Sequence, residues 1–260
     1  MKILMCKPDH FDIEYEINPW MHRENQVDWG TVRVQWQKLY DTYKKLGVEI
    51  ELIQSVKNLP DMTFVANGGI VYDTTFISSN HRYKERKGEE KYFQKWFADH
   101  GYNVKTLTHY QGGEGDALFY RDILYMGYGF RSEIEAHKEV EQILGVKTVS
   151  LRLVNPYFYD FDTAFCPIGD TAVLYYPAAF DTKSLGILEK IPNAIAITKA
   201  HAEHFVGNSV YFNGKVLVEF LDDQLKDIVK KIGVEPILLD MSEFKKSGGG
   251  IKCLTLYLKK

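Results

Sequence analysis

The chain has few cysteines and no excess of positive charge over its 260 residues. Its three cysteines, Cys6, Cys166 and Cys253, are an odd number without a CxxC pair, which argues against a disulfide framework and predicts a reduced, cytoplasmic protein. The 35 Asp and Glu residues outnumber the 32 Lys and Arg residues, and the net charge is -3. Because binding to phosphates needs a basic surplus, we expect small molecules rather than nucleic acid as partners.

Long apolar runs are missing as well. The N-terminus lacks the extended apolar stretch of a signal peptide. The longest apolar pieces, such as residues 171–180, are strand-sized and fall short of the roughly 18 residues that span a membrane, so no membrane partner is expected. A hydrophobic content of 45% and an aromatic content of 14% nevertheless supply a large core, which excludes a disordered tail and a fibre.

Five segments carry apolar residues at the i, i+3, i+4 spacing of an amphipathic helix. In the first of them, Val32, Trp36, Leu39 and Tyr43 form one stripe. Most of these segments are followed by a glycine and a short strand, and the glycine supplies a left-handed helix cap. The predicted helices cover residues 32–46, 89–100, 132–144, 182–191 and 221–232.

Pairs of short strands lie between the predicted helices, and the last pair turns at Asn213-Gly214. The order strand, strand, helix, strand recurs about five times, which favours an α/β fold with a closed ring of ββαβ modules over a solenoid. Polar loop residues would then face a central channel. No linker interrupts the chain, so we expect one domain over residues 1–260. The predicted pairs are 62–64 with 69–78, 117–120 with 122–127, 164–166 with 172–176, and 210–212 with 215–219.

Three segments combine glycine with polar residues, namely 64–69, 111–118 and 247–255. Glycine lets the backbone approach a ligand closely, and the Asn, Asp or Cys beside it supplies a reactive or hydrogen-bonding group. Each segment alone is compatible with an ordinary turn. Three of them in a chain of repeats indicate a site.

Asp160 and Asp162 lead directly into an apolar strand. In an extended chain these two carboxylates lie on one face. They would repel each other there, so that either one keeps its proton to higher pH or a cation lies between them. A guanidinium ion suits such a pair because each carboxylate accepts paired N–H bonds. An exposed acidic turn is the alternative interpretation.

Cys253 follows three consecutive glycines and precedes an apolar strand. Such an open, backbone-lined position suits a nucleophilic cysteine, and an inert buried thiol is the alternative. Cys166, between Phe165 and Pro167, has no polar neighbour to activate it and is expected in the core.

Together these motifs resemble the guanidino-group-modifying enzymes of the pentein, or amidinotransferase, superfamily, and in particular the arginine dihydrolase domain of cyanobacteria. The resemblance implies a five-bladed α/β propeller. It also implies a hydrolase that cleaves C–N bonds of arginine or a related guanidino compound through a covalent cysteine amidino intermediate, without a metal or a cofactor. The matching segments are 5–10, 17–21, 60–68, 84–86, 127–133, 176–177 and 252–256.

The resemblance assigns roles to particular residues. Cys253 would attack the guanidinium carbon, while Asp116 and Asp162 would hold the guanidinium group. Asn67 is associated with the dihydrolase branch, which removes both nitrogens, whereas deiminases usually have Asp there. The positions that match those binding the amino-acid end of the substrate are Asn18, Arg86 and Arg131, and arginine suits a carboxylate.

Two departures from the family pattern concern the acid and base. Asp160 stands where the family has the His of a His-x-Asp motif, and the family Glu aligns with Gly112, close to Glu114. We therefore take Asp160 and Glu114 as candidate catalytic residues, although Asp160 could carry a proton only if its pKa were raised, for example by Asp162.

The loss of the family His leaves other interpretations open. His201 or His204 could replace it from a distance, although a satisfied surface or interface histidine is their ordinary interpretation. The chain could also be a non-catalytic arginine-binding module, or an enzyme whose two carboxylates select a different cationic amine or amidine. A homo-oligomer is compatible with the sequence.

Overall fold

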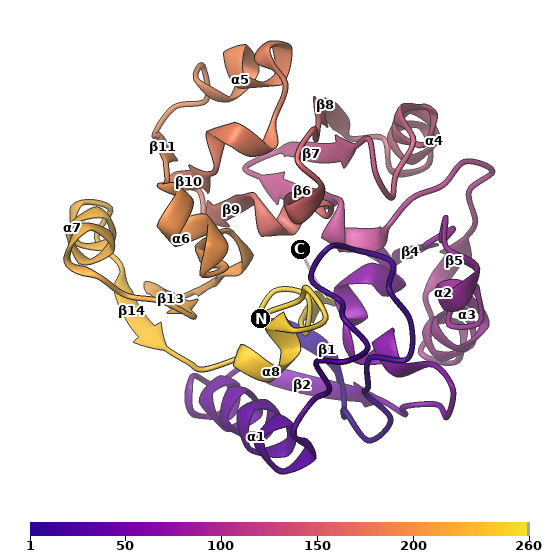
Figure 1. The fold of residues 1–260 in the computed structure, drawn as a ribbon. Helices are drawn as coiled ribbons and strands as arrows, with labels where there is room; N and C mark the ends of the chain where they lie inside the picture. The colour runs from indigo at the N-terminus through magenta and orange to yellow at the C-terminus, as the bar shows by residue number, and fades with distance from the viewer. Residues whose placement is uncertain (259–260) are drawn as a thin grey trace.

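The computed structural model describes residues 1–258, which form five three-stranded sheets around a common centre (Figure 1). Four of the sheets share one pattern, in which two antiparallel strands form a hairpin and a third strand runs parallel to the second. Their strands are β3 (Gly69–Tyr72), β4 (Thr75–Ser78) and β5 (Asn103–Lys105), β6 (Ala117–Tyr120), β7 (Ile123–Tyr128) and β8 (Lys147–Arg152), β9 (Phe165–Ile168), β10 (Ala172–Tyr175) and β11 (Ala194–Ala196), and β12 (Val210–Phe212), β13 (Lys215–Val218) and β14 (Glu235–Leu238).

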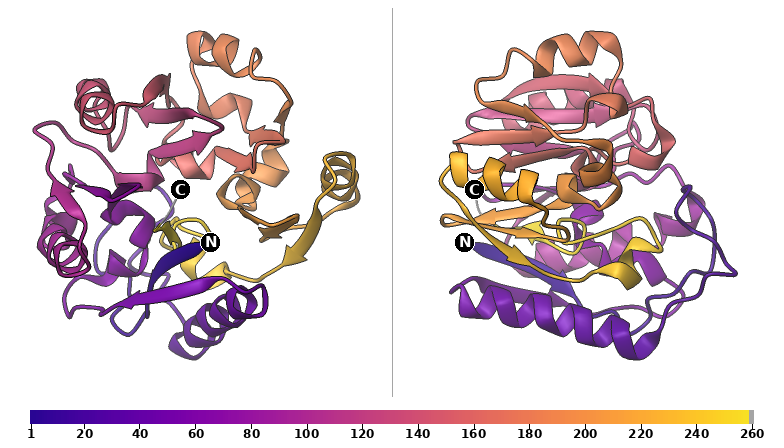
Figure 2. Two further views of the ribbon diagram at one scale, coloured as in Figure 1. Left: turned by 180° about the vertical axis from the view of Figure 1, so that it is seen from behind. Right: turned by 60° about the vertical axis from the view of Figure 1, so that its left-hand side comes forward.

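The fifth sheet joins the two ends of the chain. The last strand, β15 (Leu256–Tyr257), pairs antiparallel with β1 (Lys2–Cys6), and β2 (Glu49–Ile53) runs parallel to β1. Seen from either face, β1 lies close to the centre of the ring (Figures 1 and 2). This pairing closes the ring and brings the turn that carries Cys253 next to the first strand.

Helices connect the second strand of each blade to its third strand and lie on the outer side of the ring (Figures 1 and 2). The arrangement confirms the predicted order of strand, strand, helix and strand. The connecting helices are α1 (Trp29–Lys45), α2 (Lys84–Lys87) with α3 (Glu90–Asp99), α4 (Ile134–Leu144), α5 (Thr182–Leu188) and α7 (Asp223–Lys231).

Helix α1 illustrates how the sequence specifies these connections. Its N-cap is Asp28, whose side chain accepts a hydrogen bond from the backbone N–H of Thr31. The apolar stripe predicted from the sequence is buried. Gly47 follows the helix with a φ of +76°, a left-handed conformation that glycine adopts without a steric penalty. The corresponding glycines of three other blades also have positive φ, at Gly101, Gly145 and Gly233.

Some predicted elements were wrong. Residues 60–63 form a 3-10 turn, η1 (Pro60–Thr63), and the hairpin of that blade lies entirely within residues 69–78. The short helices α6 (Lys199–Glu203) and α8 (Ser242–Lys245) were not predicted, because two turns or fewer give no periodic signal. In the part of the chain that the structure describes, no helix is both long and apolar enough to cross a membrane.

Candidate active site

Five short turns meet at the centre of the ring, and each lies directly before the first strand of a blade. Four are the 3-10 turns η2 (Val65–Gly68), η3 (Gly113–Gly115), η5 (Phe161–Thr163) and η7 (Val206–Asn208), and the fifth spans residues 251–254 before β15. Turn η3 contacts η2 and η5, and η5 contacts η7. The ring thereby gathers one polar turn from every blade. The polar residues on or beside these turns include Asn67, Glu114, Asp116, Asp160, Asp162, Asn208 and Cys253.

The sulfur of Cys253 lies between two buried side chains. The thiol donates a hydrogen bond to Oδ2 of Asp162 at 3.3 Å, and Nδ2 of Asn208 donates one to the sulfur at 3.2 Å. Cys253 is only 2% exposed, so the open surroundings expected from its glycines are not found. Burial raises the pKa of this thiol well above its usual value, and the charges of Asp162 and Asp160 raise it further. In the free protein Cys253 is therefore a neutral thiol.

The glycines before Cys253 allow their turn to pack closely against its surroundings. A Cβ atom at Gly249 would lie 2.3 Å from the ring of Phe64, and one at Gly250 would lie 1.9 Å from the carboxylate of Glu219. Larger residues would displace the turn, so this stretch is glycine-rich because it must hold Cys253 close to the ring centre.

Asp160 and Asp162 lie at the start of η5 and within it, not on an extended strand as the sequence suggested. Oδ2 of Asp160 accepts a hydrogen bond from Nδ2 of Asn67 at 3.2 Å and lies 3.3 Å from Nη1 of Arg131. Oδ1 of each carboxylate is buried and has no hydrogen-bond partner among the described residues. Buried polar atoms normally have partners, so these two oxygens mark a place where a ligand can supply N–H donors.

The exposed-turn interpretation is excluded, because Asp160 and Asp162 are 1% and 0% exposed. Burial raises the pKa of Asp162 to about 7, and the neighbouring Asp160 adds to the shift. Burial also raises the pKa of Asp160, while Arg131 acts in the opposite direction. At neutral pH the pair can therefore hold or release a proton.

Asp116, which precedes β6, accepts a hydrogen bond from the same turn η5. Its Oδ1 accepts a hydrogen bond from the backbone N–H of Phe161 at 2.9 Å, and its Oδ2 accepts one from Ser132 at 2.6 Å. Burial and the charge of Asp160 raise the pKa of Asp116 well above its usual value. Both of its oxygens are thus engaged within the protein.

Within residues 1–258, no group of three or more His, Cys, Asp or Glu side chains is arranged to hold a metal ion.

The two arginines that the resemblance implicated both lie at the site. Arg86 is buried and forms two hydrogen bonds with the carboxylate of Glu89, at 2.9 and 2.8 Å, and a third with Oδ1 of Asn67 at 2.8 Å. Arg131 places its guanidinium 4.3 Å from the ring centre of Tyr159, and its Nε has no hydrogen-bond partner among the described residues. Each nitrogen of the Arg86 guanidinium thus has a protein acceptor, whereas the Nε of Arg131 has none among the described residues.

Glu114 is engaged in a buried ion pair. Its Oε2 lies 3.0 Å from Nζ of Lys252 and accepts a further hydrogen bond from the backbone N–H of Tyr257 at 3.3 Å. Nζ of Lys252 also donates to the backbone oxygen of Thr255 at 2.9 Å. The pair joins the second blade to the C-terminal segment.

Asn18 lies on the long loop between β1 and α1, which extends beyond the strands at one end of the ring (Figure 2). Its Nδ2 donates a hydrogen bond to the backbone oxygen of Ser247 at 3.1 Å, and its Oδ1 accepts one from the backbone N–H of Trp20 at 2.9 Å. Asn18 therefore ties this loop to the glycine turn before Cys253.

The two candidate histidines are satisfied outside this cluster. His201 is fully buried, and its Nε2 lies 3.1 Å from each carboxylate oxygen of Asp222. His204 is exposed and stacks on the ring of Phe220. Their contacts agree with the ordinary interpretation, although His201 lies in the interior rather than at the surface.

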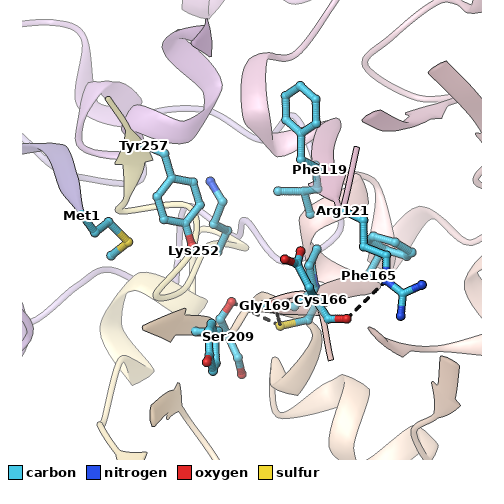
Figure 3. A pocket seen from close by; sticks show the side chains of 13 residues that line it. Met1, Phe119, Arg121, Phe165, Cys166, Gly169, Ser209, Lys252 and Tyr257 are labelled. Atoms are coloured by element: carbon cyan, nitrogen blue, oxygen red, sulfur yellow. Dashed lines mark hydrogen bonds between the residues drawn. The ribbon is translucent and has the colours of Figure 1, made fainter. Parts of the chain in front are cut away.

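A cavity of about 340 Å³ borders Lys252 but not Cys253 (Figure 3). Cys166 lines it and donates a hydrogen bond to the backbone oxygen of Ser209 at 3.4 Å. Burial raises the pKa of Cys166 to about 12, so this thiol is unreactive, as expected. None of the carboxylates around Cys253 lines the cavity, and the candidate chemistry lies elsewhere.

Comparison with known proteins decides the family. The model of the eukaryotic N,N-dimethylarginine dimethylhydrolase family matches residues 7–259. The chain belongs to this family. It is 39% identical to the bifunctional arginine dihydrolase/ornithine cyclodeaminase ArgZ of Synechocystis over 98% of its own length. It is also 37% identical to the N(G),N(G)-dimethylarginine dimethylaminohydrolase of Mycobacterium tuberculosis, covering 97% of this chain and 84% of that protein. The chain spans about 37% of the length of ArgZ.

Solved structures of family relatives agree. A mutant of the N-terminal domain of ArgZ bound to substrate superimposes with a TM-score of 0.96 at 38% identity, covering 100% of this chain and 98% of that domain. A dimethylarginine dimethylaminohydrolase at 18% identity shares the fold with a TM-score of 0.78. The resemblance and the five-bladed fold predicted from the sequence are both confirmed.

Direct contacts connect most of the predicted site residues of this family member. Cys253 contacts Asp162, and Asp160 contacts both Asn67 and Arg131. Asn208, which contacts Cys253, was not predicted from the sequence. Its position on the turn before the first strand of the fourth blade is the signal that could have revealed it, since the other blades carry their site residues there.

Proposed function

We propose that the protein hydrolyses C–N bonds of the guanidino group of arginine or a related compound through a covalent intermediate on Cys253. The observation that carries the proposal is the pair of unpartnered carboxylate oxygens on Asp160 and Asp162, because the other oxygen of Asp162 contacts the sulfur of Cys253. A guanidinium ion supplies both the positive charge and the planar set of N–H donors that such oxygens accept. The similarity to arginine dihydrolase and dimethylarginine dimethylaminohydrolase supports the same reaction class.

Substrate binding activates the nucleophile. The carboxylates of Asp162 and Asp160 raise the pKa of Cys253, so a bound cation that neutralises them favours the thiolate. The thiol already donates to Asp162, which takes the proton as the sulfur attacks the guanidinium carbon. The new S–C bond forms as the C=N electron pair moves onto nitrogen.

The proton on Asp162 then serves the leaving group. One nitrogen of the tetrahedral adduct takes this proton and departs as ammonia, and an amidino group remains on sulfur. Asp162 next takes a proton from water as the oxygen adds to the same carbon. The C–S bond then breaks as Asp162 returns its proton to the sulfur, and the hydroxyl proton of the adduct leaves with the ammonia as ammonium, which frees the ureido product. A second round on that product releases the other ammonia and leaves a carbamate, which loses carbon dioxide to give the amine, so that two waters are consumed in all.

The geometry favours Asp162 over Asp160 as the proton carrier. Asp162 is in direct contact with the sulfur, whereas the engaged oxygen of Asp160 is held by Arg131 and Asn67. We therefore assign proton transfer to Asp162 and the capture of the cation to Asp160 together with it. Glu114 is paired with Lys252 and is assigned no part in proton transfer.

A second substrate class is favoured by the state of the two arginines. Each nitrogen of the Arg86 guanidinium has a protein acceptor, and Nη1 of Arg131 is paired with Asp160. A substrate carboxylate could accept from the free Nε of Arg131, but it would have to compete with Asp160 for Nη1. A guanidino compound without a carboxylate, such as agmatine, avoids that competition.

The test is incubation of the protein with arginine, agmatine, citrulline and methylated arginines, with ammonia and the amine product quantified. Because Asn67 is present, we expect the dihydrolase outcome with arginine, which is ornithine without accumulated citrulline. Calorimetric titration of the same compounds accompanies the assay. Tight binding without ammonia from any of them would contradict the hydrolase and favour an arginine-binding module.

The cellular setting follows from the cysteines. Cys6, Cys166 and Cys253 are all unpaired and buried. The proposed reaction needs Cys253 as a free thiol, so we place the protein in a reducing compartment, the cytoplasm.

A further inference from the structure

One buried amide links the nucleophile to its carboxylate partner. Asn208 is fully buried, and its Oδ1 accepts hydrogen bonds from the backbone N–H groups of Lys252 at 3.0 Å and Cys253 at 3.2 Å. Its Nδ2 donates to the sulfur of Cys253 at 3.2 Å and to the backbone oxygen of Asp162 at 3.1 Å. Both the oxygen and the nitrogen of the Asn208 amide are therefore hydrogen-bonded to residues of the site.

The backbone around Asn208 is shaped to reach this position. Phe205 has a φ of +55°, a left-handed conformation that is costly for a bulky residue and persists only where its surroundings enforce it. A Cβ atom at Gly207 would lie 2.2 Å from the backbone oxygen of Thr163, so only glycine lets η7 press against η5 here. The turn that carries Asn208 therefore has both a strained backbone at Phe205 and close packing at Gly207.

We infer that Asn208 is a further residue of the reaction site, which positions Cys253 against Asp162 and stabilises the thiolate through its N–H donor. The sulfur donates to Asp162 and accepts from Asn208 at the same time, so the two bonds fix the direction of the S–H group. An N–H donor favours the charged form of its acceptor and opposes the field of the nearby carboxylates. The inference deepens the proposed function, because it supplies stabilisation for the nucleophile on which that function rests.

The test compares the reactivity of Cys253 in the wild-type protein, Asn208→Asp and Asn208→Ala. Iodoacetamide alkylation is followed without substrate, and mass spectrometry of the peptide that contains Cys253 separates it from the other cysteines. Below the thiol pKa, the rate follows the thiolate fraction, so a ratio of rates at one pH reports the change in pKa. We expect alkylation about 10- to 100-fold slower in both variants, since a hydrogen bond to a charged group is lost.

The two variants answer different objections. Asn208→Asp has the same shape and keeps an oxygen for the backbone N–H groups of Lys252 and Cys253, although the backbone oxygen of Asp162 loses its donor. Asn208→Ala removes the donor without adding charge. Ser209→Ala is the matched control, because the hydroxyl of Ser209 bonds to the backbone oxygen of Val206 in the same turn and not to Cys253. Thermal unfolding checks that each protein is folded, and if Asn208→Ala does not fold, Asn208→Asp decides.

The outcomes separate this inference from the proposed function. We expect kcat to fall in parallel with the alkylation rate in the Asn208 variants, with a smaller change in KM. Wild-type alkylation rates in Asn208→Asp would overturn the inference, whether or not turnover is seen. Slower alkylation in the variants, together with a wild-type protein that turns over no guanidino compound, would support the inference and refute the proposed function.

Discussion

Two sets of buried carboxylates lie near the centre of the ring, and they differ in how their charge is compensated. Glu114 and Asp162 are 2% and 0% exposed, so burial does not distinguish them. Oε2 of Glu114 is bonded to Nζ of Lys252 and to a backbone N–H, whereas Oδ1 of Asp162 has no partner among the described residues. A compensated buried charge thus holds the ring together, and we infer that an uncompensated one is kept for a ligand.

Two consecutive residues, Lys252 and Cys253, contact one carboxylate of each kind. Lys252 points its ammonium at Glu114 and lies over the ring of Tyr257 at 5.0 Å, and Cys253 points its sulfur at Asp162. Changing Lys252 should therefore affect stability, and changing Cys253 should affect turnover.

The largest expected effect is on turnover. Cys253→Ser should lower kcat about 10⁴-fold or more, because serine provides no thiolate near neutral pH, and it should leave the fold intact. Ammonia release under substrate saturation measures the effect. Cys166→Ala is the matched control and should retain activity, since that thiol is unreactive. A Cys253→Ser protein with wild-type turnover would refute the covalent mechanism.

The compensated pair should show the next largest effect, on stability. Lys252→Met leaves Glu114 buried and unpaired, which should lower the free energy of unfolding by about 3–5 kcal/mol in urea titrations. Lys95→Met is the control, because Lys95 pairs with Asp99 on an exposed helix surface, and its loss should cost about 0.5 kcal/mol or less. Equal effects of the two substitutions would contradict the structural role of the Lys252 pair.

Local sequence signals were sufficient for much of the fold. The hairpin at 117–127 and the glycine that follows α4 depend on periodicity and turn chemistry within a few residues, and the structure confirms both. The strand predicted at 62–64 failed because those residues form a 3-10 turn whose neighbours lie on other segments, as the hydrogen bond from Thr63 to the backbone oxygen of Cys6 shows. Such a turn has no local period to recognise.

The candidate site, like the fold, could be predicted from the sequence only in part. Cys253 and Asp162 are recognisable from glycine runs, acidic pairs and family resemblance. The unpartnered carboxylate oxygens near them are not recognisable from the sequence, because they depend on which donors the other blades bring within reach. Asn208 was missed for this reason, since only the closed ring places it against residues 45 and 46 positions away in the chain.

The uncompensated carboxylate should also reveal itself in the pH dependence of stability. The pKa of Asp162 is raised to about 7 in the folded protein, against a reference of about 4 in the unfolded chain. Protonated Asp162 therefore favours the folded state, and this contribution is fully present below about pH 4 and lost as pH rises through 7. Asp162→Asn should thus gain stability relative to wild type on going from pH 4 to pH 8, by on the order of 1.4 kcal/mol for each unit of pKa shift.

Urea titrations of both proteins at the two pH values measure this gain. Asp99→Asn, at an exposed position, serves as the control. A difference between wild type and Asp162→Asn that does not vary with pH would mean that Asp162 stays ionised when buried, and the role of proton carrier would then fail with it.

The smallest expected effect concerns Asp160, which stands between the two kinds of carboxylate because one oxygen is paired with Arg131 and the other is unpartnered. Asp160→Asn removes the competitor for Arg131, so the guanidinium becomes available to a substrate carboxylate. We expect the ratio of kcat/KM for arginine to that for agmatine to rise by about 3- to 10-fold, corresponding to a hydrogen bond worth on the order of 1 kcal/mol. The effect should appear mainly in KM, since Asp160 makes no hydrogen bond to the sulfur.

Asp160→His provides the complementary measurement, because it restores the histidine of the family pattern while also releasing Arg131. A loss of kcat in Asp160→Asn as large as that in Asp162→Asn, with recovery in Asp160→His, would make Asp160 the proton carrier and transfer to it the role that the hydrogen bond from Cys253 gives to Asp162.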